Sequence, residues 1–240
     1  MKAMIFAAGL GSRLRPLTDD RPKALVELNG EPMIAGVIKK MIAAGVTEIV
    51  VNLHHFADEL RQYLAMYDFG LPIHFSDERS LLLDTGGGLK NAANFFKDGE
   101  AFFVYNVDIL SNIDLAKLYH QHLENKALAT LAVRNRKTSR YLLFDKDSQL
   151  SGWENTLTQE LRLINAERKD LFPLAFSGVQ VIDPSIFEKM PKKAKFSIID
   201  VYLRLAATES IKAYIHDDDY WFDLGTVQQL QTAEDFVRIT

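Results

Sequence analysis

A glycine-rich, basic segment follows the first apolar run of the chain. It reads Gly9-Leu10-Gly11-Ser12-Arg13-Leu14-Arg15-Pro16-Leu17-Thr18, and Pro22-Lys23 follows it. Glycines let the backbone approach a phosphate chain closely and direct its amide groups at the oxygens. The side chains of Arg13 and Lys23 can neutralise the charge of those oxygens. The segment therefore predicts a site for a triphosphate.

The segment does not match either of two well-known phosphate-binding motifs. A Walker A loop needs Gly, four residues and then Gly-Lys-Ser/Thr, which this segment lacks, and the dinucleotide fingerprint needs a third glycine where Leu14 stands. A bare Gly-x-Gly also occurs in ordinary surface turns. The adjoining arginine, Pro-Leu-Thr and Pro-Lys favour the ligand site over the turn.

A second glycine cluster, Asp84-Thr85-Gly86-Gly87-Gly88, precedes a predicted helix. Three consecutive glycines cost backbone entropy, so they indicate that a planar or anionic group approaches the bare backbone closely. A base or a ribose would fit there. An ordinary flexible loop is the alternative explanation.

Two acidic residues are candidates for a magnesium site. Asp108 belongs to Asn106-Val107-Asp108, at the end of the most apolar run, and Asp223 belongs to Trp221-Phe222-Asp223-Leu224-Gly225-Thr226. Mg²⁺ is a hard cation that accepts one or two carboxylates together with phosphate oxygens. We expect Asp223 to open the C-terminal helix, where a simple helix cap is the competing role.

The elements that would position these residues alternate between strands and helices. We expect strands at 3–8, 48–52, 72–76 and 101–106, and helices at 33–44, 57–67, 87–96 and 115–125. Such an alternation predicts a doubly wound parallel layer, and ligands in these sheets bind beyond the carboxyl ends of the strands. The loops after Ala8 and Asn106 are therefore the expected site.

The second half of the chain has the pattern of an α+β lobe that continues the same sheet. Strands are predicted at 128–133, 141–145, 149–153, 174–182 and 211–216, and helices at 199–207 and 227–237. We expect one domain over 1–240, with a first half at about 1–125, the α+β lobe at about 126–215 and a C-terminal helix with the candidate metal ligand Asp223 at about 216–240.

The composition excludes several classes of protein. Of 240 residues, 48% are hydrophobic and 25% are charged, which is typical of a globular chain that buries a sizeable core. The net charge of −4 argues against nucleic acid as a partner. Cysteine is absent, which removes disulfides and thiolate metal sites and suits a reducing compartment. No apolar run is long enough to span a membrane, so we expect a cytoplasmic protein.

The segment from Gly9 to Thr18, with Pro22-Lys23, resembles the signature of the sugar-1-phosphate nucleotidylyltransferases. The resemblance implies a Rossmann-like three-layer α/β/α fold (GT-A-like), with a mixed central sheet and a small α+β sugar-binding lobe. It implies Mg²⁺ on Asp108 and Asp223, with Arg13 and Lys23 as further catalytic residues. The nucleotide-binding residues that it implies are Ala8, Gly9, Gly11, Ser12, Arg13, Lys23, Gly86, Gly87 and Asn106.

On the acceptor side, Phe176-Ser177-Gly178-Val179 resembles the strand that lines the sugar pocket in this family, although a glycine at a strand bulge is an equal alternative. The resemblance implies Glu154, Ser177 and Gly178 as sugar-binding residues. Thymidylyl-transferring relatives carry Glu-Lys-Pro where this chain has Glu154-Asn155-Thr156. The lysine for the sugar phosphate is thus missing, and Lys195 is a candidate replacement.

Within the family, the chain looks most like the compact bacterial N-acetylmuramate 1-phosphate uridylyltransferases and the mannose or heptose 1-phosphate guanylyltransferases. The expected partners are an NTP, UTP or GTP, and a sugar 1-phosphate, in a monomer or small homo-oligomer. Since the sequence stops at Thr240, we expect no left-handed β-helix acyltransferase domain. A nucleotide-sugar-dependent glycosyltransferase and a non-catalytic nucleotide-sugar sensor are the other hypotheses; pyrophosphate release separates them from a nucleotidylyltransferase.

Overall fold

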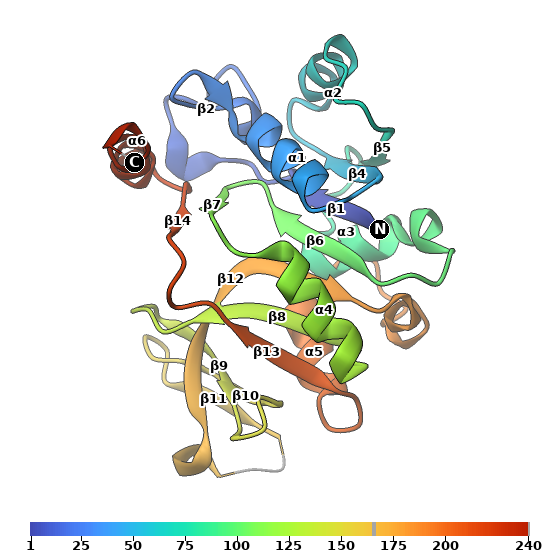
Figure 1. Cartoon of the computed structure of the whole chain (residues 1–240), viewed down its shortest axis with the longest axis vertical. Helices are drawn as coiled ribbons and strands as arrows, with labels where there is room; N and C mark the ends of the chain where they lie inside the picture. The colour runs from blue at the N-terminus through green and yellow to red at the C-terminus, as the bar shows by residue number, and fades with distance from the viewer. Residues whose placement is uncertain (165–166, 240) are drawn as a thin grey trace.

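A ten-stranded mixed sheet runs through the whole structure, a computed structural model that describes residues 1–164 and 167–239 (Figure 1). Eight strands follow one another in the order β11-β10-β9-β12-β6-β1-β4-β5, and β8 and β13 branch off at β12. Both halves of the chain therefore share one sheet, as the sequence predicted.

The N-terminal half supplies the parallel part of this sheet. Strand β1 (Lys2–Phe6) lies between β4 (Glu48–Leu53) and β6 (Phe102–Asn106), and β5 (Ile73–Asp77) pairs with the outer side of β4. Their near-continuous apolar sequences suit strands that are covered on both faces. The carboxyl ends of these four strands point to one edge, where the predicted ligand loops emerge.

The second half supplies antiparallel strands. The long β12 (Phe172–Ile182) pairs antiparallel with β6, β8 (Ala129–Arg134) and β9 (Arg140–Phe144), and so joins the two halves. Strands β10 (Leu150–Asn155) and β11 (Glu160–Leu163) extend the sheet beyond β9, and β13 (Ile211–Ile215) runs parallel to β8. All four residues of β11 are exposed, so it carries no alternation from which it could be predicted.

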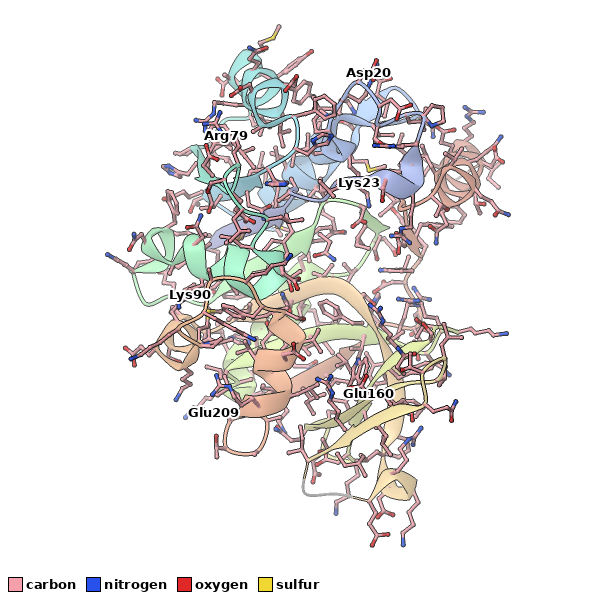
Figure 2. The ribbon with its side chains drawn as sticks, turned by 180° about the vertical axis from the view of Figure 1, so that it is seen from behind. Asp20, Lys23, Arg79, Lys90, Glu160 and Glu209 are labelled. Carbon is pink, nitrogen blue, oxygen red and sulfur yellow. The ribbon has the colours of Figure 1, made fainter. Side chains whose placement is uncertain are left out.

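Helices cover both faces of the sheet and complete the three layers. Side chains of α1 (Met33–Ala43), α2 (Ala57–Met66) and α4 (Leu115–Asn125) pack into one apolar core, and those of α3 (Asp84–Asn91) and α5 (Ile198–Leu205) pack into the other. Figure 1 shows α1 and α4 in front of the sheet, and Figure 2 shows the opposite face. None of the helices in the described ranges is long and apolar enough to cross a membrane.

Helix α3 begins at Asp84, three residues before its predicted start, so the glycine cluster lies inside the helix. The amides of Gly86 and Gly87 both donate to the carbonyl of Phe196, over 2.9 and 3.1 Å. A Cβ on Gly87 would lie 2.1 Å from the carbonyl oxygen of Ala194. A Cβ on Gly86 would lie 2.5 Å from the ring of Phe196, so the groups that approach these two glycines most closely belong to the protein itself.

Two short strands, β7 (Ile109–Ser111) and β14 (Trp221–Asp223), form an antiparallel pair beside the main sheet. Asp223 ends β14, and the C-terminal helix α6 (Val227–Ile239) begins only after it, so the expectation that Asp223 opens that helix was wrong. Hydrogen bonds to β7, a segment far away in the sequence, hold this residue in a strand. A further two-stranded hairpin joins β2 (Glu27–Leu28) to β3 (Glu31–Pro32).

The packing of α3 generates a prediction about stability. Gly87→Ala should lower the free energy of unfolding by about 1–3 kcal/mol. The new methyl group would clash with the backbone carbonyl oxygen of Ala194, which cannot move aside as a flexible side chain can. Gly36→Ala is the matched control, since a Cβ there would meet nothing closer than 3.9 Å within helix α1, and it should stabilise by roughly 0.5–1 kcal/mol. Urea unfolding of both variants checks this; equal effects would show that α3 does not depend on the close approach.

Candidate active site

A cavity of about 450 Å³ opens at the carboxyl ends of β1, β4 and β6. The two loops that the sequence singled out, after Ala8 and after Asn106, both contribute to it. Its lining residues come from the first loop, the central strands, the start of α3 and the segment before α5: Phe6, Ala8, Gly9, Lys23, Asn52, Glu78, Leu82, Asp84, Thr85, Asn106, Val107, Asp108 and Lys195.

The cationic end of Lys23 reaches across this cavity to the carboxylate of Asp108 and forms an ion pair with it. Lys23 is only 8% exposed and begins a short 3₁₀ turn, Lys23–Leu25, in the N-terminal half (labelled in Figure 2). A buried ammonium needs a counter-charge because desolvation is costly. Asp108 provides it, so two of the predicted catalytic residues are in contact.

The β7–β14 pair brings Asp223 to the same place. Asp223 lies opposite Ile109 in the register, and the amide of Leu224 donates to the carbonyl of Asp108 over 2.8 Å. Oδ1 of Asp223 is buried and has no hydrogen-bond partner among residues 1–164 and 167–239. A buried carboxylate oxygen without a donor is an unsatisfied acceptor, which a cation would satisfy.

Gly225 allows the guanidinium of Arg13 to come close to Asp223. A Cβ on Gly225 would lie 2.6 Å from Oδ1 of Asp223 and 2.8 Å from a terminal nitrogen of Arg13. The basic loop and the late acidic residue are therefore neighbours, as the sequence interpretation required. The four predicted catalytic residues, Arg13, Lys23, Asp108 and Asp223, converge from three parts of the chain.

The glycines of the first loop differ in their surroundings. Gly11 has a φ of +64°, and a Cβ there would lie 2.9 Å from Thr18 and 3.1 Å from Lys23, so this position requires glycine. The hydroxyl of Thr18 donates to the carbonyl of Gly11 over 2.9 Å and closes the loop. Gly9 is exposed with open space around its Cα, and Ser12 is exposed at the start of the turn that follows.

A buried polar network, which sequence reasoning missed, supports the loop from behind. Oδ1 of Asn52 accepts the amides of Ala7 and Ala8 over 2.7 and 3.2 Å, and its Nδ2 donates to Glu78 over 2.8 Å. The other carboxylate oxygen of Glu78 accepts the amide of Leu83. Burial raises the pKa of Glu78, although these two hydrogen bonds oppose the shift. The one available signal was an asparagine and a glutamate at the ends of otherwise apolar strands.

The second glycine cluster contributes to the cavity through its first two residues. Asp84 and Thr85 line the wall, whereas Gly86 and Gly87 pack against the Phe196 backbone. The hydroxyl of Thr85 accepts the amide of Ile198 over 3.0 Å and so fixes the start of α3 to the start of α5. A nucleoside contact of Gly86 and Gly87 stays a prediction.

The predicted sugar-binding residues lie on the other side of β6, and protein groups already contact each of them. Gly178 has a φ of +76° at a register shift in β12, and a Cβ there would lie 2.9 Å from Nδ2 of Asn106. The bulge proposed as an alternative for Gly178 is therefore present, and it makes room for Asn106. The carboxylate of Glu154 accepts two hydrogen bonds of 2.8 Å from Arg168.

Ser177 is fully buried, and its hydroxyl is hydrogen-bonded to Nε2 of His216 over 2.7 Å. Asp219 lies 3.5 Å from the other ring nitrogen, so the three residue types of a nucleophilic triad are together. Burial lowers the pKa of His216, which favours its neutral form. Because no surface of Ser177 is open to a substrate, this cluster supports β12 from within.

Arg136, in the loop between β8 and β9, is a second group that sequence reasoning missed. Its guanidinium carbon lies 4.3 Å from the ring centroid of Trp221, two residues before Asp223. The Trp221 indole nitrogen donates in turn to the carbonyl of Ser177 over 2.9 Å. Three arginines stand in this stretch, Arg134, Arg136 and Arg140, and no spacing distinguishes the one that faces the site.

Comparison of the sequence with known proteins identifies its family and several relatives. The Nucleotidyl transferase family matches residues 2–239. The N-acetylmuramate α-1-phosphate uridylyltransferase of Caulobacter vibrioides is 33% identical over 239 residues, which cover 97% of this chain and 95% of that protein. The mannose-1-phosphate guanyltransferase of Yarrowia lipolytica is 30% identical over 230 residues, which cover 94% of this chain and 61% of that protein.

Solved structures share the fold over the full length of the chain. A putative glucose-1-phosphate thymidylyltransferase from Bacillus anthracis has a TM-score of 0.81 with 19% identity, covering 100% of this chain and 96% of its own. HddC from Yersinia pseudotuberculosis has a TM-score of 0.79 with 23% identity, covering 98% of this chain and 99% of its own. These likenesses support the three-layer α/β/α assignment.

The polar network behind the first loop yields a prediction. Asn52→Ala removes the acceptor of two buried amides and the donor to Glu78, so the free energy of unfolding should fall by about 2 kcal/mol. Asn94→Ala, which shortens an exposed amide side chain, should change it by less than about 0.5 kcal/mol. Urea denaturation measures both; a similar small change in the two variants would mean that the network does not hold the loop.

Proposed function

Because the chain belongs to the nucleotidyl transferase family, we propose that it transfers a nucleotidyl group from an NTP to a sugar 1-phosphate and releases pyrophosphate. The observation that carries this proposal is the convergence of Arg13, Lys23, Asp108 and Asp223 at one edge of the sheet. Lys23 and Asp108 line the cavity, and Asp223, with Arg13 close to it, adjoins Asp108. Such a group of charges suits a reaction that brings several phosphate groups together.

The reaction forms one bond and breaks one. An oxygen of the sugar phosphate attacks the α-phosphorus of the NTP in line, and the bond from that phosphorus to the oxygen bridging the α- and β-phosphates breaks. The electron pair of that bond leaves with pyrophosphate. A phosphate monoester has a second pKa near 6, so the attacking group is already largely dianionic at neutral pH and needs no general base. Positioning and charge neutralisation therefore supply the catalysis.

Arg13 and Lys23 have the charge and the placement to bind the triphosphate and the departing pyrophosphate. The loop that carries Arg13 offers backbone amides at Gly11 and Ser12, and Ala8 and Gly9 form the adjoining wall. Binding requires Lys23 to exchange the Asp108 carboxylate for phosphate oxygens, since the two residues are paired in the free protein. In this proposal Gly86, Gly87 and Asn106 bind the nucleoside part of the NTP.

The donor set fits a magnesium ion. Asp108 and Asp223 are brought together by the β7–β14 pairing, and the buried, unpartnered Oδ1 of Asp223 is an acceptor of the kind that a hard cation uses. When bound, the ion would supply positive charge to the phosphate groups that react. Two carboxylates suffice for Mg²⁺, because the substrate's phosphate oxygens and water complete its coordination.

UTP with N-acetylmuramate 1-phosphate is the substrate pair that we propose. The uridylyltransferase of Caulobacter vibrioides aligns with this chain over nearly the whole length of both proteins, and so does a second one from Neisseria meningitidis, 28% identical over 235 residues. In this assignment the sugar lies against Glu154, which is paired with Arg168. Ser177 and Gly178 are buried, so they support the strand behind the pocket and do not contact the sugar through exposed surface. Such an enzyme would work in the cytoplasm and feed cell-wall synthesis.

GTP with a mannose or heptose 1-phosphate is the second candidate. Guanylyltransferase relatives match nearly as well in identity, although this chain covers 61% of their length, and HddC has also been solved with GMP-PN. The protein environment of the cavity, with Leu82 and Thr85 on its wall, admits either base.

A substrate grid tests the proposed function. Pyrophosphate release with Mg²⁺ should occur for one matched pair among UTP, GTP, CTP, ATP and dTTP, each combined with the 1-phosphates of N-acetylmuramate, mannose, glucose and N-acetylglucosamine. The same assay without the sugar phosphate, or with EDTA, should give no release. Nucleotide binding without release in any combination would contradict the proposal and favour a non-catalytic sensor.

Replacing one acid separates chemistry from binding. Asp108→Asn should lower kcat by at least about 100-fold, because charge placement at the reacting phosphates is lost, while the Kd for the NTP changes by less than about fivefold. Asp147→Asn, which removes the same charge from an exposed turn, should leave both values unchanged. Steady-state kinetics and calorimetry measure the two quantities; parallel loss of turnover and binding would argue against the metal role of Asp108.

A further inference from the structure

The proposed reaction, on which this inference rests, needs a cation for the acceptor phosphate. Arg13 lies beside Asp223 on the triphosphate loop, and Lys23 is paired with Asp108. In the proposed reaction both of these cations therefore bind the donor nucleotide. A dianionic sugar phosphate that approaches a triphosphate meets strong repulsion, so a further positive group on the acceptor side is required.

The position where relatives carry a lysine cannot supply that charge. Asn155 stands there, and its side-chain oxygen accepts the amides of Leu157 and Thr158 in the turn after β10. The nearby Arg168 is already paired with Glu154 through two hydrogen bonds. Lys195 lies on the wall of the same cavity as Lys23 and Asp108, on the nucleotide side.

Arg136 has a guanidinium with unused hydrogen-bonding capacity beside β14, the strand that carries Asp223. One terminal nitrogen donates to the carbonyl of Phe176 over 3.1 Å, and the planar group stacks on Trp221. Its Nε is buried and has no hydrogen-bond partner within the described parts of the chain. Such stacking fixes the orientation of the plane while it leaves the edge free for an anion.

The relation of Arg136 to Asp223 fits an anion between them. Arg136 stacks on Trp221, which stands two residues before Asp223 in the same short strand, β14. Among residues 1–164 and 167–239, Nε of Arg136 and Oδ1 of Asp223 are both buried and have no hydrogen-bond partner. Nε of Arg136 is a donor without an acceptor, and Oδ1 of Asp223 is an acceptor without a donor or a cation.

We propose that Arg136 binds the phosphate group of the sugar 1-phosphate and presents it to the α-phosphorus of the nucleotide. Trp221 holds the guanidinium plane, and the bond from its indole to Ser177 ties that platform to β12. The same strand, β14, carries Asp223, so one element orients the acceptor cation and one metal ligand. Arg136 takes the role of the missing lysine from a different loop.

Kinetics with both substrates varied tests this assignment. Arg136→Gln should raise KM for the sugar 1-phosphate by about 10–100-fold, the loss of one or two charge-assisted hydrogen bonds, with KM for the NTP changed less than twofold. Arg136→Lys should recover part of the loss, because it restores charge without the planar fork. Lys137→Gln, the same charge change on the exposed neighbouring residue, should leave both constants unchanged.

Three results would overturn the assignment: an unchanged KM for the sugar phosphate in Arg136→Gln, an equal rise in both KM values, or a selective rise for the sugar phosphate in Lys195→Gln alone. Thermal melting and NTP binding of each variant show whether it is folded. Arg136→Lys, which keeps the charge, provides the second variant where the glutamine variant does not fold.

A binding measurement separates failure of this inference from failure of the proposed function. The chain has two tryptophans, so Trp153→Phe leaves Trp221 as the reporter beneath Arg136. Glucose 1-phosphate, but not glucose, should change its fluorescence, and Arg136→Gln should raise the Kd at least about tenfold. That response in a protein silent across the substrate grid would keep the anion site and reject the transfer reaction. An unchanged Kd in the variant would reject the anion site alone.

Discussion

The antiparallel pairing of β7 with β14 is the contact on which the candidate site depends. Asp108 lies in the turn between β6 and β7, and Asp223 comes near the end of the chain. The hydrogen bond from Leu224 to the carbonyl of Asp108 makes them neighbours. The pair is only three residues long, so its own bonds contribute little stability. The two hydrophobic cores and the long β12 hold its partners in place.

Oppositely charged side chains lie next to one another around this strand pair. Lys23 neutralises Asp108, Asp223 lies near Arg13 of the loop after β1, and Arg136 stacks on Trp221, two residues before Asp223. Lys23 and Asp108 thus balance each other's charge in the free protein, whereas Nε of Arg136 and Oδ1 of Asp223 have no hydrogen-bond partner within the described residues. Such an arrangement is stable without ligand and still has hydrogen-bonding capacity for anions and a cation, which is what a site for phosphate chemistry requires.

Glycine has three different physical roles near the site. Gly11 adopts a left-handed conformation, Gly225 leaves room for a guanidinium beside a carboxylate, and Gly87 permits backbone to approach backbone. The third case shows why glycine clusters are ambiguous in a sequence. Any group that approaches closely demands the absence of a side chain, and the pattern does not say whether that group is a ligand or another part of the protein.

The sequence by itself determined the alternation of strands and helices, the parallel character of the first half, and the two loops that meet at the cavity, because apolar periodicity and glycine–basic patterns are local properties. It also pointed to Asp108 and Asp223, but it placed the latter in a helix. The tertiary structure decided what depends on long-range contacts: the β7–β14 pair, the Asn52–Glu78 network behind the loop, and the stacking of Arg136 on Trp221. Pairing partners, buried polar networks and the direction of one arginine among several are set by the folded surroundings, which no local pattern encodes.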